Sequence, residues 1–202
     1  MNMKTKIILL LAMIVIALEP ILAADFAAAV AAGKITVTFH GTGGSSGDSV
    51  EVVVAKTAKS GADLELTIAS GTRLRNGFAS AQNMVIAAVQ GQKMGERSYL
   101  PTSVIRVEDT PKTYVLDAYC TDFEKENPSS QSEFQLGKVD PILVCILSDA
   151  SYLSTQAKQA TVWIYTDKTS YSHVNAKFAV SRSDWDAAAA IVRKRSDKRS
   201  GN

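Results

Sequence analysis

The residues of this chain that are best suited to covalent chemistry lie in two short segments. The first is Tyr119-Cys120-Thr121-Asp122, and the second runs Gln159-Ala160-Thr161-Val162-Trp163-Ile164-Tyr165-Thr166-Asp167. A cysteine thiolate is a strong nucleophile, and nearby carboxylates such as Asp122 and Asp167 can orient groups or shuttle a proton. These segments are therefore the first place to look for a reactive site.

Together the two segments resemble the thioester domains of surface adhesins. In that family a cysteine at the end of a strand, in a Tyr-Cys-x-Asp/Asn setting, joins a helical glutamine that is followed by Ala-Val/Ile-Trp and then Thr-Asp. Cys120 and Gln159 stand at the matching positions. The resemblance implies an internal thioester between them, with supporting roles for Tyr119, Asp122, Trp163, Thr166 and Asp167. It also implies covalent attachment at a cell surface, without a cofactor and without enzymatic turnover.

The chemistry of such a bond follows from the two side chains. A thiolate attacks the carboxamide of a glutamine held beside it, ammonia leaves, and an amine or hydroxyl of a partner can later open the acyl thioester. Trp163 comes four residues after Gln159, so on a helix it lies on nearly the same face and can exclude water. Gln156 shares that face and is a second candidate for the acyl donor.

The second cysteine leaves other states of Cys120 open. In an exported chain, two cysteines most simply pair, and a disulfide between Cys120 and Cys145 would remove the nucleophile. Cys145, however, sits in an apolar run at residues 142–147, where a buried free thiol behaves as a small apolar side chain. The chain would then be a non-covalent binding or structural module, with the thiols bridged or inert.

A glycine- and serine-rich segment offers a less favoured alternative, a serine hydrolase. Residues 43–47 fit G-x-S-x-G around Ser45, and the sequence from Gly47 to Val50 resembles the opening of GDSL-type esterases around Ser49. A nucleophile elbow needs a strand before it and a helix after it, whereas a strand follows here. A flexible hairpin loop is therefore the better interpretation.

The two histidines lie far apart in the sequence, and neither has a second potential ligand at the spacing of a metal site with a matching second pair. No metal site is therefore predicted.

The N-terminus has the pattern of a secretory signal peptide. Lys4 and Lys6 give a positive n-region, residues 7–18 form an apolar run too short to span a bilayer, and Glu19-Pro20 breaks that run. The small residues that follow predict cleavage after Ala23 or Ala24. We therefore expect a secreted or cell-surface protein with no membrane span after the signal is removed.

The charge balance bears on the partners. Without residues 1–23, the chain's 22 basic and 20 acidic residues fall to 20 and 19, which is nearly neutral. A nucleic-acid-binding face is not expected, because the basic residues cluster only near the C-terminal end. The expected partner is an extracellular protein or surface ligand that carries an amine or hydroxyl.

The elements that must position these residues change type at Cys120. Before it, β-branched runs of period two predict strands near residues 35–39, 50–55, 64–68, 84–89, 104–107 and 114–119. After it, caps predict helices that open at Asp140-Pro141, at Ser154 or Thr155, and at Ser181. The strand-rich half also resembles uncharacterised secreted prokaryotic proteins with Ser-Gly-Asp-Ser, Gly-Thr and Gln-Asn-Met-Val in this order, here at residues 46–49, 71–72 and 82–85.

The predicted class is α+β. An antiparallel β-sandwich of about six or seven strands is followed by a small cap of about two or three helices. The expected organisation is a signal peptide at 1–23, an Ala-rich lead at 24–33, the sandwich at 34–119, a helical, thioester-like part of the same domain at 120–195, and a basic tail at 196–202.

Overall fold

A computed structural model describes residues 23–96 and 98–200, without the side chains of residues 197–200. The predicted n-region, the apolar run and the Glu19-Pro20 break lie outside the described residues, as do the last two residues of the predicted tail. Within the described part, no helix is both long and apolar enough to cross a membrane.

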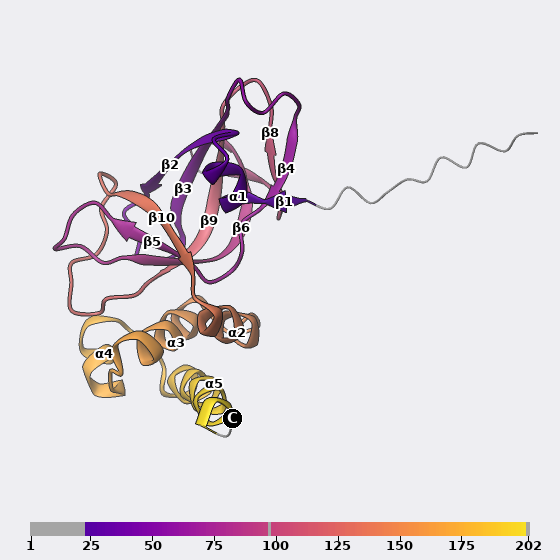
Figure 1. Cartoon of the computed structure of the whole chain (residues 1–202). Helices are drawn as coiled ribbons and strands as arrows, with labels where there is room; N and C mark the ends of the chain where they lie inside the picture. Colours follow the sequence, from indigo (N-terminus) through magenta and orange to yellow (C-terminus); the bar gives the residue numbers. More distant parts are fainter. Residues whose placement is uncertain (1–22, 97, 201–202) are drawn as a thin grey trace, which may run out of the picture.

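Six antiparallel strands form a closed barrel, which lies above the helices in Figure 1. In barrel order they are β5 (Thr72–Asn76), β10 (Glu133–Val139), β2 (Ile35–Gly41), β3 (Ser46–Lys56), β9 (Lys112–Cys120) and β6 (Met84–Gly95). The barrel closes where β5 pairs with β6, with Leu74 opposite Met84. A further strand, β7 (Ser98–Pro101), extends β6 outside the closed ring.

This barrel corrects the predicted β-sandwich, although the overall class is α+β. Period two identifies a strand with one buried face, and that pattern is the same whether the sheet stays open or curls into a ring. Here β3 and β6 each carry register shifts against β9, and bulges of this kind bend and twist a sheet. The closing strands β5 and β10 are short, and β10 buries only Phe134 fully, so their sequence pattern is weak.

A small three-stranded sheet and a short helix lie beside the barrel. The sheet consists of β1 (Ala24–Asp25), β4 (Leu64–Thr67) and β8 (Ile105–Val107). Helix α1 (Phe26–Ala31) follows β1, and its N-cap is Asp25, whose carboxylate accepts from the Ala28 amide at 2.6 Å. The predicted Ala-rich lead thus forms a strand and a helix that bury Phe26 in the core.

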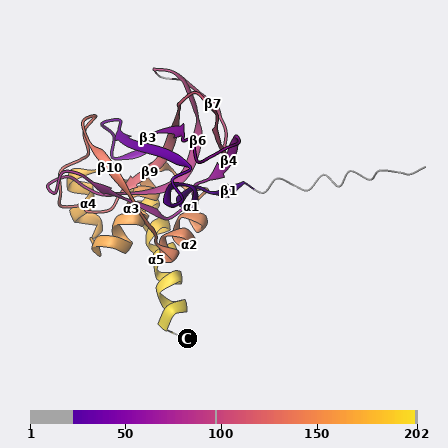
Figure 2. The ribbon, with the colours of Figure 1, turned by 45° about the horizontal axis from the view of Figure 1, so that its top comes forward.

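Four helices gather at one end of the barrel (Figure 1). They are α2 (Pro141–Asp149), α3 (Thr155–Asp167), α4 (Tyr171–Lys177) and α5 (Arg182–Ser200), and the C-terminal part of α5 extends away from the rest of the molecule in Figure 2. The predicted caps are confirmed for α2, where Asp140 accepts from two backbone amides, and for α3, where Ser154 accepts from the Ala157 amide. Helix α4 has no counterpart among the predicted elements.

Gly71 fixes the junction between the barrel and α2. Its φ is +79°, and an added Cβ would lie 2.8 Å from the Asp140 carbonyl oxygen. The Gly71 carbonyl also accepts from the Asp140 amide at 2.9 Å. This close approach, which only glycine permits, anchors the start of α2 against the start of β5.

The end of β9 is buried on both faces. Cys120 belongs to a core cluster that runs from the barrel interior to Ala160 and Trp163 of α3. Its neighbour Tyr119 points the other way, into a second cluster with Leu143 of α2 and Val162 of α3. Because successive strand side chains alternate, the helices cover both sides of this strand end. The two halves of the chain therefore meet at Cys120.

Candidate functional site

The side chain of Gln159 lies against the backbone of Cys120. The Cys120 amide donates to Gln159 Oε1 at 3.0 Å, and Gln159 Nε2 donates to the Cys120 carbonyl at 2.9 Å. Both residues are fully buried. The carboxamide thus pairs with the last residue of β9 as a neighbouring strand would, although it comes from a helix 39 positions away.

This pairing brings the two candidate reactants together. The carboxamide carbon lies between Oε1 and Nε2, which bond the two backbone groups on either side of the Cys120 Cα. The thiol is attached through the Cβ of the same residue. In this arrangement Cys120 is a free thiol, and its Sγ lies 3.7 Å from the sulfur of Met84.

Helix α3 directs Gln159, rather than Gln156, toward Cys120. The Ser154 cap sets the start of the helix, and the face toward the barrel then carries Gln159, Ala160 and Trp163, all buried. Gln156 is exposed to solvent. The predicted second acyl donor is therefore not brought to Cys120.

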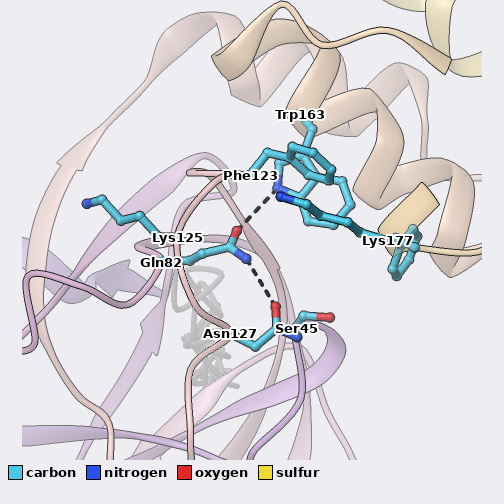
Figure 3. Close-up of a pocket in the computed structure, with 8 residues that line it drawn as sticks. Ser45, Gln82, Phe123, Lys125, Asn127, Trp163 and Lys177 are labelled. Atoms are coloured by element: carbon cyan, nitrogen blue, oxygen red, sulfur yellow. Dashed lines mark hydrogen bonds between the residues drawn. The ribbon is translucent and has the colours of Figure 1, made fainter. Parts of the chain in front are cut away.

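Trp163 lies one turn beyond Gln159 and is only 2% exposed. Its Nε1 donates to Gln82 Oε1 at 3.3 Å, and its ring packs edge-on against Phe123 and Phe178 with centroid separations of 4.9 and 5.1 Å. Gln82 is itself buried and donates to Asn127 Oδ1 at 3.0 Å, as the dashed lines in Figure 3 show. A fixed aromatic ring therefore covers the pair on this side.

The two predicted supporting carboxylates bind backbone amides in the segment after Cys120. Asp122 accepts from the Asn83 amide at 2.9 Å, and Asp167 accepts from the Phe123 amide at 3.2 Å. The Thr166 hydroxyl donates to Asp167 and to the Val162 carbonyl. These bonds join the segment after β9 to the residue before β6 and to α3. The two carboxylates therefore position the backbone around Cys120.

Burial governs the electrostatics of the site. It raises the pKa of the Cys120 thiol, and the nearby Asp122 carboxylate raises it further. Burial also raises the pKa of Asp167, against the opposing hydrogen bonds from Thr166 and the Phe123 amide. The thiol is therefore protonated at neutral pH, and its proton must be transferred when the sulfur reacts.

Tyr119 faces away from the thiol. Burial, followed by the Asp117 carboxylate, raises the pKa of its phenol. Burial likewise raises the pKa of Asp117, although a hydrogen bond from Tyr119 opposes the effect. Tyr119 thus supports the site by packing the outer face of β9 against α2 and α3.

Cys145 is half-buried on α2 and is a free thiol, as is Cys120. The structure does not join the two cysteines.

Ser49 of the predicted hydrolase alternative is 1% exposed, and its hydroxyl donates to the carbonyls of Gly47 and Ala118. That hydroxyl joins β3 to β9. Within the described residues, no group of three or more His, Cys, Asp or Glu side chains could hold a metal ion.

No family model, curated protein or solved structure matches the chain.

Three residues beside the pair were not predicted to support a thioester. Gln82 holds the Trp163 indole, Met84 contacts the thiol, and the carbonyl of Ser45 accepts from the Cys120 amide at 3.1 Å. Gln82 and Met84 belong to the Gln-Asn-Met-Val block at residues 82–85, so the sequence contains a signal for them. Ser45 is predicted from the sequence only as a nucleophile.

Proposed function

We propose that Cys120 and Gln159 form an internal thioester through which the protein attaches covalently to a partner outside the cell. The observation that carries the proposal is the pair of hydrogen bonds, 3.0 and 2.9 Å long, between the Gln159 carboxamide and the Cys120 backbone. They hold a buried carboxamide against the backbone of the buried residue that carries the thiol.

The reaction balances with these two groups alone. The sulfur attacks the carboxamide carbon, the bond from that carbon to Nε2 breaks, and the nitrogen leaves as ammonia after taking the thiol proton. A partner amine or hydroxyl then attacks the same carbon, and the sulfur leaves and regains a proton. The products are an amide or ester at Gln159 and a free Cys120 thiol.

Burial supports this chemistry because water competes with the partner. Both reactants are fully buried, and Trp163 with Phe123 closes one side. Exclusion of water from a reactive intermediate prevents its hydrolysis. The predicted signal peptide, with cleavage after Ala23 or Ala24, fits an attachment role outside the cell.

A non-covalent binding or structural module is the second candidate, and one observation favours it. The two hydrogen bonds give the oxygen and the nitrogen of the Gln159 amide one backbone partner each, as a buried structural glutamine requires. In that case Gln159 only joins α3 to the end of β9.

The intact mass of the purified mature chain separates these functions. The thioester requires a mass lower than that of the free-thiol chain by one ammonia, and both Cys120→Ala and Gln159→Ala must abolish that loss. Gln156→Ala is the matched control, because it removes an exposed glutamine from the same helix and should leave the loss intact. A loss of two hydrogens would indicate a Cys120–Cys145 disulfide, and no loss would favour the structural module.

A further inference from the structure

A cavity of about 170 Å³ is lined in part by residues that neighbour Cys120 and Gln159 in the structure or in the chain. Figure 3 draws the residues that line it: Ser45, Gln82, Phe123, Lys125, Asn127, Trp163, Lys177 and Phe178. It is smaller than the roughly 300–1,000 Å³ typical of sites for drug-sized ligands. A cavity of this size suits one small unit of a ligand rather than an extended chain.

The lining residues connect the cavity to the reactive pair. The Ser45 carbonyl accepts from the Cys120 amide, Phe123 follows Cys120 by three residues, and Trp163 follows Gln159 by one helical turn. On the strand side, Gln82 precedes the Met84 that contacts the thiol. Residues that contact the pair, or lie within one helical turn of it in the chain, therefore form part of the cavity wall.

The polar groups of the lining are cationic or neutral. None of the eight lining residues is acidic, whereas Lys125 and Lys177 both contribute to the wall. The carboxylates that neutralise them, Asp122 and Glu124, do not line it. An incoming anion can exchange with these partners for the lysines, whereas an incoming ammonium finds no carboxylate in the wall, and this difference favours anionic ligands.

The neutral groups suit a polyhydroxylated ligand. The amide of Asn127 and the hydroxyl of Ser45 can each donate and accept hydrogen bonds, and both residues are at least partly exposed. The ring of Phe178, which is partly exposed, adds an apolar surface. Hydroxyl groups on a largely apolar ring match this combination.

We propose that the cavity binds a saccharide unit and presents one of its hydroxyls to the thioester, with acidic sugars favoured by Lys125 and Lys177. The inference rests on the proposed function. The hydroxyl oxygen attacks the acyl carbon of Gln159, the carbon–sulfur bond breaks, and the hydroxyl proton passes to the departing sulfur. The product is a sugar ester at Gln159 with Cys120 as a free thiol.

The test compares acceptors on the purified mature chain. The chain is incubated at neutral pH with methyl glucuronide, methyl glucoside or Nα-acetyl-lysine methylamide, and adducts are measured by intact mass. We expect the glucuronide adduct to form at least about tenfold faster than the lysine adduct. Hydroxylamine at alkaline pH should release the sugar, because it cleaves oxygen esters under these conditions and leaves amides intact. A faster lysine adduct, or no sugar adduct on a chain that has lost ammonia, overturns the inference.

Variants separate the cavity from the reactive pair. Lys125→Gln with Lys177→Gln should slow the glucuronide adduct severalfold and speed the lysine adduct, while reaction with hydroxylamine, which is small and uncharged at neutral pH, stays unchanged. Lys34→Gln is the matched control, because this exposed lysine lies between α1 and β2 and does not line the cavity. Equal rates in the double variant and the wild type would contradict the assigned role of the lysines. If the intact mass of the mature chain shows no loss of ammonia, no thioester has formed. That result overturns the proposed function, and the proposed saccharide acceptor with it.

Discussion

Gln159 completes the hydrogen bonding of Cys120 from a helix, with its amide oxygen on the Cys120 amide and its amide nitrogen on the Cys120 carbonyl. The Gln159 side chain therefore has a structural role and a chemical role at the same position. It joins the helical end to the barrel, and it sets a carboxamide beside a thiol.

The structural contribution of Gln159 can be measured without the thioester. In a Cys120→Ala background, Gln159→Ala should lower the free energy of unfolding by about 2–4 kcal/mol, because it leaves a buried carbonyl unpaired and opens a cavity. Gln156→Ala in the same background should change it by less than about 0.5 kcal/mol. Urea denaturation measures both, and equal effects would show that the pairing seen at Cys120 does not stabilise the fold.

Trp163 should protect the thioester from water. Trp163→Phe removes the donor to Gln82 Oε1 and should cost about 1–2 kcal/mol of stability. The fraction of chains that lack ammonia should then decay faster, with water added in its place, as followed by intact mass over time. Trp185→Phe is the control, because Trp185 packs against Tyr171 rather than at the site. Equal decay in the two variants would count against a lid at Trp163.

Asp140 should make stability fall in acid. Burial raises its pKa, but hydrogen bonds from Arg73 and from the Leu143 and Ile142 amides outweigh this, and the pKa is lowered overall. Its contribution is therefore present above the unfolded pKa of about 3.9 and is lost as the pH falls through the folded value. Asp140→Asn keeps a capping side chain and should flatten this dependence, whereas Asp140→Ala should also lose about 1 kcal/mol at neutral pH. Thermal melts from pH 2 to 7 would show the two behaviours.

Asp117 should act in the opposite direction. Because burial raises its pKa, its contribution is present below about pH 3.9 and is lost as the pH rises through the folded value. Asp117→Asn should therefore be more stable than the wild type at neutral pH, and the difference should vanish in acid. If Asp117→Asn is less stable than the wild type at pH 7, the interactions of the charged carboxylate with its surroundings must outweigh the cost of burying it.

The helices were easier to predict from the sequence than the closure of the sheet. Asp140-Pro141 and Ser154 are local signals, since a cap and its helix lie within a few residues, and the structure places caps there. Closure depends on the pairing of Leu74 with Met84 and on the short strand around Phe134, which are far apart in the chain. Alternation of side chains predicts which residues are buried, but it does not say which strands meet.

The same distinction applies to the site. Cys120 and Gln159 were selected by short sequence blocks, and the structure brings them into contact. The partners of Asp122 and Asp167 are backbone amides, which no side-chain pattern reveals. Gln82 becomes part of the site because it accepts a hydrogen bond from Trp163, which lies 81 positions away in the sequence. Such contacts depend on the tertiary fold, so the cavity they form could not be predicted beforehand.

The central claim is a covalent bond between Cys120 and Gln159, and peptide mapping tests it most directly. The mature chain is digested with pepsin in acid, without reductant or free amines, and the peptides are sequenced by tandem mass spectrometry. The thioester predicts one joined pair of peptides, containing Cys120 and Gln159, whose mass is their sum less one ammonia and which separates on treatment with hydroxylamine. Recovery of the two peptides only as separate, unmodified species, or of Cys120 joined to Cys145, would contradict it.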